Sequence, residues 1–243
     1  MPKINSLFKR GANNTSMAFR PNIDRLADVI QYLRNTEAFG PEWFLMGDTE
    51  QDSYLYPAFD AAGHLTPAAE AVLETRFKGK KSRYLGVWNG KLEEGEGASM
   101  VFKFRESDWP ASSLEIDHQD GVTRLGFDQV KELLSIIAVE LRPMVITVAR
   151  NQYSDKQVFR DRPGAGWMLY LPHVLTSSQV LEARELQPVM AKQENGKAFQ
   201  IGTIVVTVNS EPFSDENPEH VKIANAIEIR LVDQDLLPRY ADL

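Results

Sequence analysis

The chain has 243 residues, a formal net charge of −7 and no cysteine, which excludes disulfides, thiol catalysis and cysteine-ligated zinc. Its length suits one large domain or two small ones, and its acidic balance disfavours direct nucleic-acid binding, which needs a basic face. The chain has neither an apolar run of roughly 18 residues nor an N-terminal signal-peptide core, so we expect a cytoplasmic protein outside the membrane.

The first half of the chain begins with helical patterns. Residues 1–16 are polar and predict a loosely structured N-terminal segment, followed by a single domain over residues 17–243. Asn22 is a suitable N-cap for a helix whose apolar residues recur at helical spacing. A second helix is expected from Thr66, as N-cap, with proline at its first position.

The apolar period then changes to two, which is typical of strands. Asn89-Gly90 is a turn signal between two strands. Met100, Phe102 and Phe104 alternate with the residues at 101, 103 and 105 and predict a half-buried strand, and residues 112–118 predict another.

The second half mixes the two patterns. We expect a long helix over residues 127–141, a strand directly after it, and a short helix over residues 177–184. A hairpin is predicted around Asn195-Gly196, and Asn217 caps the last helix. Helices and antiparallel hairpins alternate, so the fold class is α+β, an antiparallel sheet packed with several amphipathic helices. An arrangement as two helix–sheet halves stays open.

The stretch "GAGWMLYLP" over residues 164–172 allows two interpretations. Its glycines could cradle a phosphate, but a dinucleotide fingerprint needs a strand before the glycines and a helix after them. Here a turn signal comes first and a short apolar run follows, stopped by Pro172. We therefore expect a turn that leads into a buried strand.

No catalytic constellation is complete in the sequence. Glu115, Asp117 and His118 could form a metal or acid–base site, but acidic residues on an exposed strand edge explain the pattern more simply. In a strand, Glu115 and Asp117 share one face and His118 points away. Glu228 lies between two isoleucines and predicts a buried carboxylate with Arg230 or a backbone amine as its partner.

Two groups of residues are candidates for protein contacts. The segment "EEGEGA" concentrates three glutamates in a predicted hairpin loop, which is either a solvated turn or an acidic surface for a basic partner. The aromatic residues near turns are either core residues or anchors of an interface. These aromatic residues are Tyr54, Tyr56, Trp88 and Trp109.

Four stretches in order along residues 18–238 resemble the immunity protein 52 family of bacterial polymorphic-toxin systems. They are "WFLMGDTEQDSYLYPAF", "GAGWMLYLP", "IGTIVVTVNSEPFSDENPEHVKIANAIEIRL" and the terminal "DLLP". The resemblance implies an α+β protein, made in the cytoplasm, that binds and silences a cognate toxin, typically a nuclease with a restriction-endonuclease-like domain. The family has no catalytic motif to transfer to this chain.

The sequence thus predicts an immunity protein that neutralises a nuclease effector of a type VI secretion system. We expect no enzymatic activity, no cofactor and no metal. Two alternatives stay open, an adaptor or chaperone for a secreted effector and an uncharacterised metal-dependent enzyme. The candidate toxin-binding residues are Trp88, Glu93, Glu94, Glu96, Trp109, Glu115, Asp117, Asp120, Asp215 and Glu216.

Overall fold

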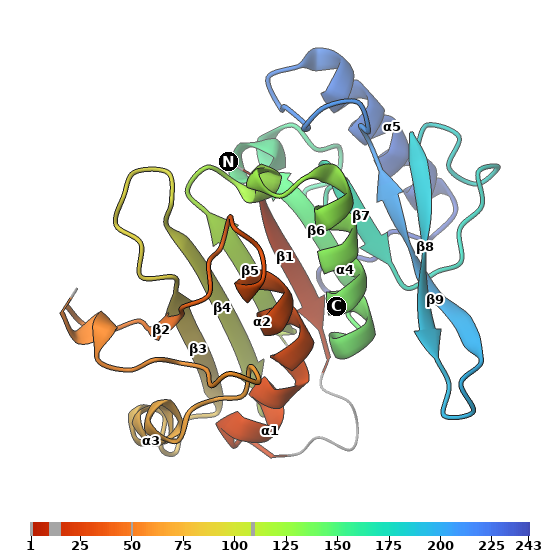
Figure 1. The fold of residues 1–243 in the computed structure, drawn as a ribbon. Helices are drawn as coiled ribbons and strands as arrows, with labels where there is room; N and C mark the ends of the chain where they lie inside the picture. The colour runs from red at the N-terminus through yellow and green to blue at the C-terminus, as the bar shows by residue number, and fades with distance from the viewer. Residues whose placement is uncertain (1, 10–15, 50, 108–109) are drawn as a thin grey trace.

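A single antiparallel sheet organises the chain (Figure 1). The computed structural model describes residues 2–9, 16–49, 51–107 and 110–243. Within these residues, nine strands lie in the order β2-β3-β4-β5-β1-β6-β7-β9-β8. Their bounds are β1 Pro2–Phe8, β2 Phe44–Leu45, β3 Ser82–Trp88, β4 Ala98–Arg105, β5 Ser112–His118, β6 Val145–Arg150, β7 Met168–Leu171, β8 Glu185–Lys192 and β9 Ala198–Val206.

Helices cover parts of the sheet, so the predicted α+β class is confirmed. α2 and α4 lie against the same side of the sheet, and in this view α5 is seen behind the upper ends of β8 and β9 (Figure 1). The helices are α1 Phe19–Ile23, α2 Ala27–Arg34, α3 Pro67–Arg76, α4 Phe127–Leu141 and α5 Pro218–Asp233. Short 3-10 turns are η1 Asp24–Leu26, η2 Asp52–Tyr54, η3 Val122–Arg124 and η4 Asn151–Asp155.

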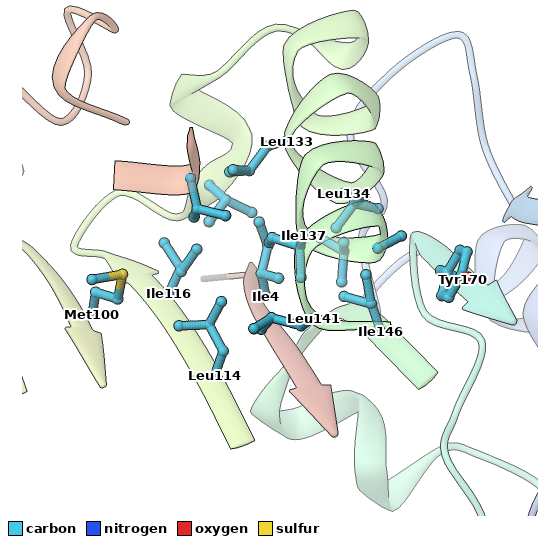
Figure 2. Close-up of a cluster of buried hydrophobic side chains, with 14 of the residues drawn as sticks. Ile4, Met100, Leu114, Ile116, Leu133, Leu134, Ile137, Leu141, Ile146 and Tyr170 are labelled. Atoms are coloured by element: carbon cyan, nitrogen blue, oxygen red, sulfur yellow. The ribbon is translucent and has the colours of Figure 1, made fainter. Parts of the chain in front are cut away.

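The central core lies between α4 and the middle strands (Figure 2). α4 has apolar residues at helical spacing, and β1 and β5 present alternate residues to the same side. Each aliphatic side chain buried here contributes about 1.5–3 kcal/mol to stability. The side chains labelled in Figure 2 are Ile4, Met100, Leu114, Ile116, Leu133, Leu134, Ile137, Leu141, Ile146 and Tyr170.

The expectation of a loosely structured segment over residues 1–16 is wrong for residues 2–8. They form β1, which pairs with both β5 and β6 in the middle of the sheet. Its buried face carries Ile4, Ser6 and Phe8, so only two large apolar residues mark that face in the sequence. Residues 10–15 lie outside the described part of the chain.

Other helix predictions have mixed outcomes. Thr66 and Asn217 cap α3 and α5 as predicted, because each side chain accepts a hydrogen bond from a first-turn amide. Asn22 is not a cap: it lies inside α1 and its amide donates to backbone carbonyls of Ser16 and Ala18. Residues 177–184 form turns instead of the predicted helix, since a stretch this short lacks its own packed face.

The stretch "GAGWMLYLP" forms a turn and then a strand, as predicted. Met168–Leu171 is β7, buried on both faces between β6 and β9. Gly166 has φ of +53°, and a Cβ there would lie 2.6 Å from the carbonyl oxygen of Val148. Glycine is therefore required for the chain to enter the sheet at this point, and the phosphate interpretation is wrong because no helix follows.

The opposite face of β4 and β5 stays partly open to solvent. Ser99 and Val101 on β4, and Glu115 and Asp117 on β5, are half-buried, whereas the alternate residues on both strands are buried. Glu115 and Asp117 thus share one face, as predicted. This open face ends at the loops that connect β3 to β4 and β5 to η3.

Candidate functional site

Most of the predicted contact residues meet at one corner of the sheet. The loop after β3 and the turn after β5 lie next to each other, and we call residues 88–97 and 117–124 the acidic corner. The amide of Gly95 donates to the side chain of Gln119 at 3.0 Å, which joins the two segments. Figure 1 shows the loop that connects the end of β3 to the start of β4, at the upper left of the view. Trp88, Glu93, Glu94, Glu96, Asp117 and Asp120 belong to this corner.

Asn89 organises the loop of the acidic corner. Its buried side chain donates to the carbonyls of Phe39 and Glu96, and accepts from the amide of Ala98 at 3.0 Å. The predicted turn signal at Asn89-Gly90 begins the connection between β3 and β4, which spans residues 89–97 and which Asn89 closes with its side chain. This loop displays its glutamates at the surface.

Ion pairs neutralise part of the corner. Glu96 contacts Lys91 at 3.0 Å and Arg124 at 2.8 Å, and Arg124 also lies 3.6 Å from Asp120. The hydrogen bond from Lys91, together with the charge of Arg124, lowers the pKa of Glu96. Glu96 is thus a structural residue of the loop as well as an acidic one.

Three other carboxylates of the corner take no part in these ion pairs. Glu93 and Glu94 are exposed, and neither has an ion-pair partner among the described residues. Asp117 likewise has none there, and one of its oxygens accepts a hydrogen bond from the amide of His118 at 2.9 Å. Five carboxylates face two cations in the corner, so its net charge is negative. The carboxylates are Glu93, Glu94, Glu96, Asp117 and Asp120, and the cations are Lys91 and Arg124.

An aromatic cluster of Phe44, Tyr54 and Trp88 borders the acidic corner. Tyr54 makes edge contacts with both neighbours, at ring-centroid distances of 5.4 and 5.1 Å. Its hydroxyl donates to the carbonyl of Gly90 at 2.8 Å. These contacts fix the rings while Tyr54 stays 39% exposed. Rigid, partly exposed aromatic rings lose little conformational entropy on binding and are typical anchors of protein interfaces.

Exposed aliphatic residues extend the aromatic cluster. Leu55 is 61% exposed and Leu92 is 59% exposed, and Tyr56 is also exposed. Leu92 is placed by the loop that Asn89 closes, next to Trp88. Sequence reasoning did not single out Leu55, Leu92 or Phe44, because a lone leucine in a loop carries no periodic signal.

His118 supports the corner from inside. Its ring is buried, with Nε2 3.1 Å from the carbonyl of Ala38 and Nδ1 accepting from the amide of Asp120 at 3.2 Å. These partners fix the neutral tautomer with the proton on Nε2. Burial lowers the pKa of His118.

The proposed metal site does not assemble. His118 points into the core, away from Glu115 and Asp117, so the three side chains do not converge. No group of three or more histidine, aspartate or glutamate side chains is placed to hold a metal within the described residues.

The other predicted residues lie elsewhere. Glu115 is on the open face, paired with Lys3 at 3.1 Å. Asp215 precedes α5 and is buried against Arg150 at 2.8 Å, while Glu216 is exposed beside it. These two acids are thus separate from the acidic corner in the fold, and Trp109 lies outside the described residues.

Comparisons with known proteins concern the fold. No family model matches the chain, and no curated protein matches it. Among solved structures, the chain is similar to the Pseudomonas aeruginosa T6SS protein PA0821, with a TM-score of 0.50 and 10% sequence identity. The similarity covers 93% of this chain and 75% of that chain. Separately, no helix in the described part of the chain is long and apolar enough to cross a membrane.

Proposed function

We propose that this chain is an immunity protein, without catalytic activity of its own, that binds and neutralises a nuclease toxin of a type VI secretion system inside the producing cell. The observation that carries the proposal is the acidic corner, where carboxylates that have no ion-pair partner among the described residues border a partly exposed aromatic cluster held by ring contacts. The sequence resemblance to the immunity protein 52 family and the shared fold of a T6SS protein support it.

The chemistry of the acidic corner suits a basic protein surface. A nuclease presents cationic groups to its phosphate substrate. Carboxylates at the rim of the corner attract such a surface and speed encounter, and aromatic residues that become desolvated on contact supply affinity. The same corner is unsuited to nucleic acid itself, because its net charge would repel phosphates.

Inhibition by stoichiometric binding is the test. The nuclease encoded beside this chain is titrated with increasing amounts of the purified protein, and cleavage of plasmid DNA is measured. We expect activity to fall linearly to a plateau at a fixed molar ratio, with no chemical change to the toxin. A saturating excess that leaves the nuclease active would overturn the proposal. Co-purification without inhibition would instead identify an adaptor or chaperone.

A further inference from the structure

A notch with walls of different chemistry lies at the edge of the acidic corner, over Ser99 of β4. Trp88, Ser99 and Asp117 are direct cross-strand neighbours on the open face, because Trp88 pairs with Ser99 and Ser99 pairs with Asp117. A small residue thus separates an indole from a carboxylate. Neighbouring strands lie about 4.8 Å apart, which places the Cα atoms of Trp88 and Asp117 about 10 Å from each other. The cavity between them has a volume of 330 Å³.

Both walls of the notch are held in place. The indole packs against Tyr54, and its Nε1 donates to the carbonyl of Ser53 at 3.4 Å. The carboxylate of Asp117 accepts one hydrogen bond from the amide of His118, and its other oxygen has no ion-pair partner among the described residues. The notch is therefore preformed, with an acidic acceptor opposite an aromatic ring.

We infer that the notch binds an arginine side chain of the protein partner. A guanidinium is planar, stacks on an indole face and donates to a carboxylate in the same geometry, whereas an ammonium is a compact, strongly hydrated charge. Lys91 also lines the cavity, but its ammonium is held by Glu96 at 3.0 Å. The inference deepens the proposed function and rests on it, because it takes the partner to be a basic protein.

The first test uses argininamide as the probe and the isotopically labelled full chain. The indole signal of Trp88, assigned by its loss in Trp88→Phe, should shift in a saturable way with argininamide. Lysinamide and the uncharged analogue citrullinamide should bind more weakly. Asp117→Asn keeps an acceptor for the His118 amide and should weaken binding at least about fivefold, since a hydrogen bond to a charged group is lost. Ser99→Leu should fill the notch and abolish the shift.

Glu115→Gln is the matched control. It removes the same charge from the same face of β5, two residues away, beside Lys3 and outside the cavity. Argininamide should bind this variant as it binds the unmodified chain. Equal binding by Asp117→Asn and Glu115→Gln, or shifts spread evenly over the surface, would overturn the inference.

The second test separates the notch from the proposed function. Dissociation of the toxin complex is measured for Asp117→Asn and Glu115→Gln, and only the first should dissociate faster. Saturable argininamide binding without inhibition of the nuclease would retain the notch and reject the proposed function. Full inhibition with unchanged dissociation of the Asp117→Asn complex would reject the notch as the toxin contact and retain the proposed function.

Discussion

Glu228 is a buried acid on α5 that connects distant parts of the chain. Tyr153 and Ala165 donate to one of its oxygens at 2.5 and 2.9 Å, and Val158 donates to the other at 2.8 Å. Burial raises the pKa of this carboxyl, while the three donors oppose that change. The sequence predicted a buried carboxylate with Arg230 or a backbone amine as its partner. The backbone donors are confirmed, whereas Arg230 pairs with another glutamate.

Replacement of this acid tests the hydrogen-bond network. Glu228→Gln places an amide N–H against a backbone N–H, whichever way the new side chain turns. We expect a loss of about 1–3 kcal/mol in the free energy of unfolding at pH 7, measured by urea denaturation. Glu219→Gln, on an exposed part of the same helix, should stay within about 0.5 kcal/mol. Equal effects of the two variants would contradict a structural role for Glu228.

Helices and turns could be predicted where residues close together in the sequence carry the signal. α4 has a clear helical period and the expected bounds, and the turn between β8 and β9 lies at the predicted Asn195-Gly196. β1 was missed because a central strand gains its stability from partners far along the chain, and its face contains Ser6 at a buried position. The notch was also beyond prediction, since the register that aligns Trp88 with Ser99 depends on the length of the loop between them.

Mild acid should lower the stability that His118 gives to the end of β5 and to the acidic corner. Burial lowers the pKa of His118 below its ordinary value of 6.5. The unfolded chain therefore binds the proton more readily, so the stabilising contribution of neutral His118 is complete above pH 6.5 and is lost as pH falls toward the lower folded-state pKa. Protonation of Nδ1 also removes the acceptor for the Asp120 amide.

The expected slope is at most about 1.4 kcal/mol per pH unit below pH 6.5. Unfolding free energies are measured between pH 8 and about pH 5, a range that stays above the ordinary carboxylate pKa values. His118→Gln retains a donor toward Ala38 and should reduce the slope. His173→Gln, at an exposed position, should keep the slope of the unmodified chain. A slope unaffected by His118→Gln would assign the acid sensitivity to other groups.

The whole molecule has a net charge of −7, and the proposed binding depends on where that charge lies as well as on its amount. Glu93 and Glu94 project from the acidic corner without ion-pair partners among the described residues, so their field reaches solvent. Glu96 belongs to the same loop, but its reversal would break the contacts with Lys91 and Arg124 and confound the measurement. A test of electrostatic steering should therefore leave Glu96 unchanged.

The double variant Glu93→Lys/Glu94→Lys provides this test. Each reversal adds two positive charges, so the net charge moves from −7 to −3. The control Glu194→Lys/Asp233→Lys has the same net charge, but it alters exposed residues on the β8–β9 turn and at the end of α5. Association with the nuclease is measured by stopped flow. At low salt the corner variant should associate roughly tenfold more slowly than the control.

The difference between the two variants should shrink as the ionic strength rises past 0.15 M, where the Debye length is about 8 Å. Dissociation should change less than association, because steering acts before contact is made. Equal association rates for the two variants would mean that total charge alone governs encounter, and the acidic corner would then lose its role in steering. Glu93 and Glu94 lie in the same loop that lines one side of the notch. Slower association of the corner variant alone would instead mean that encounter and specific contact take place at the same edge of the sheet.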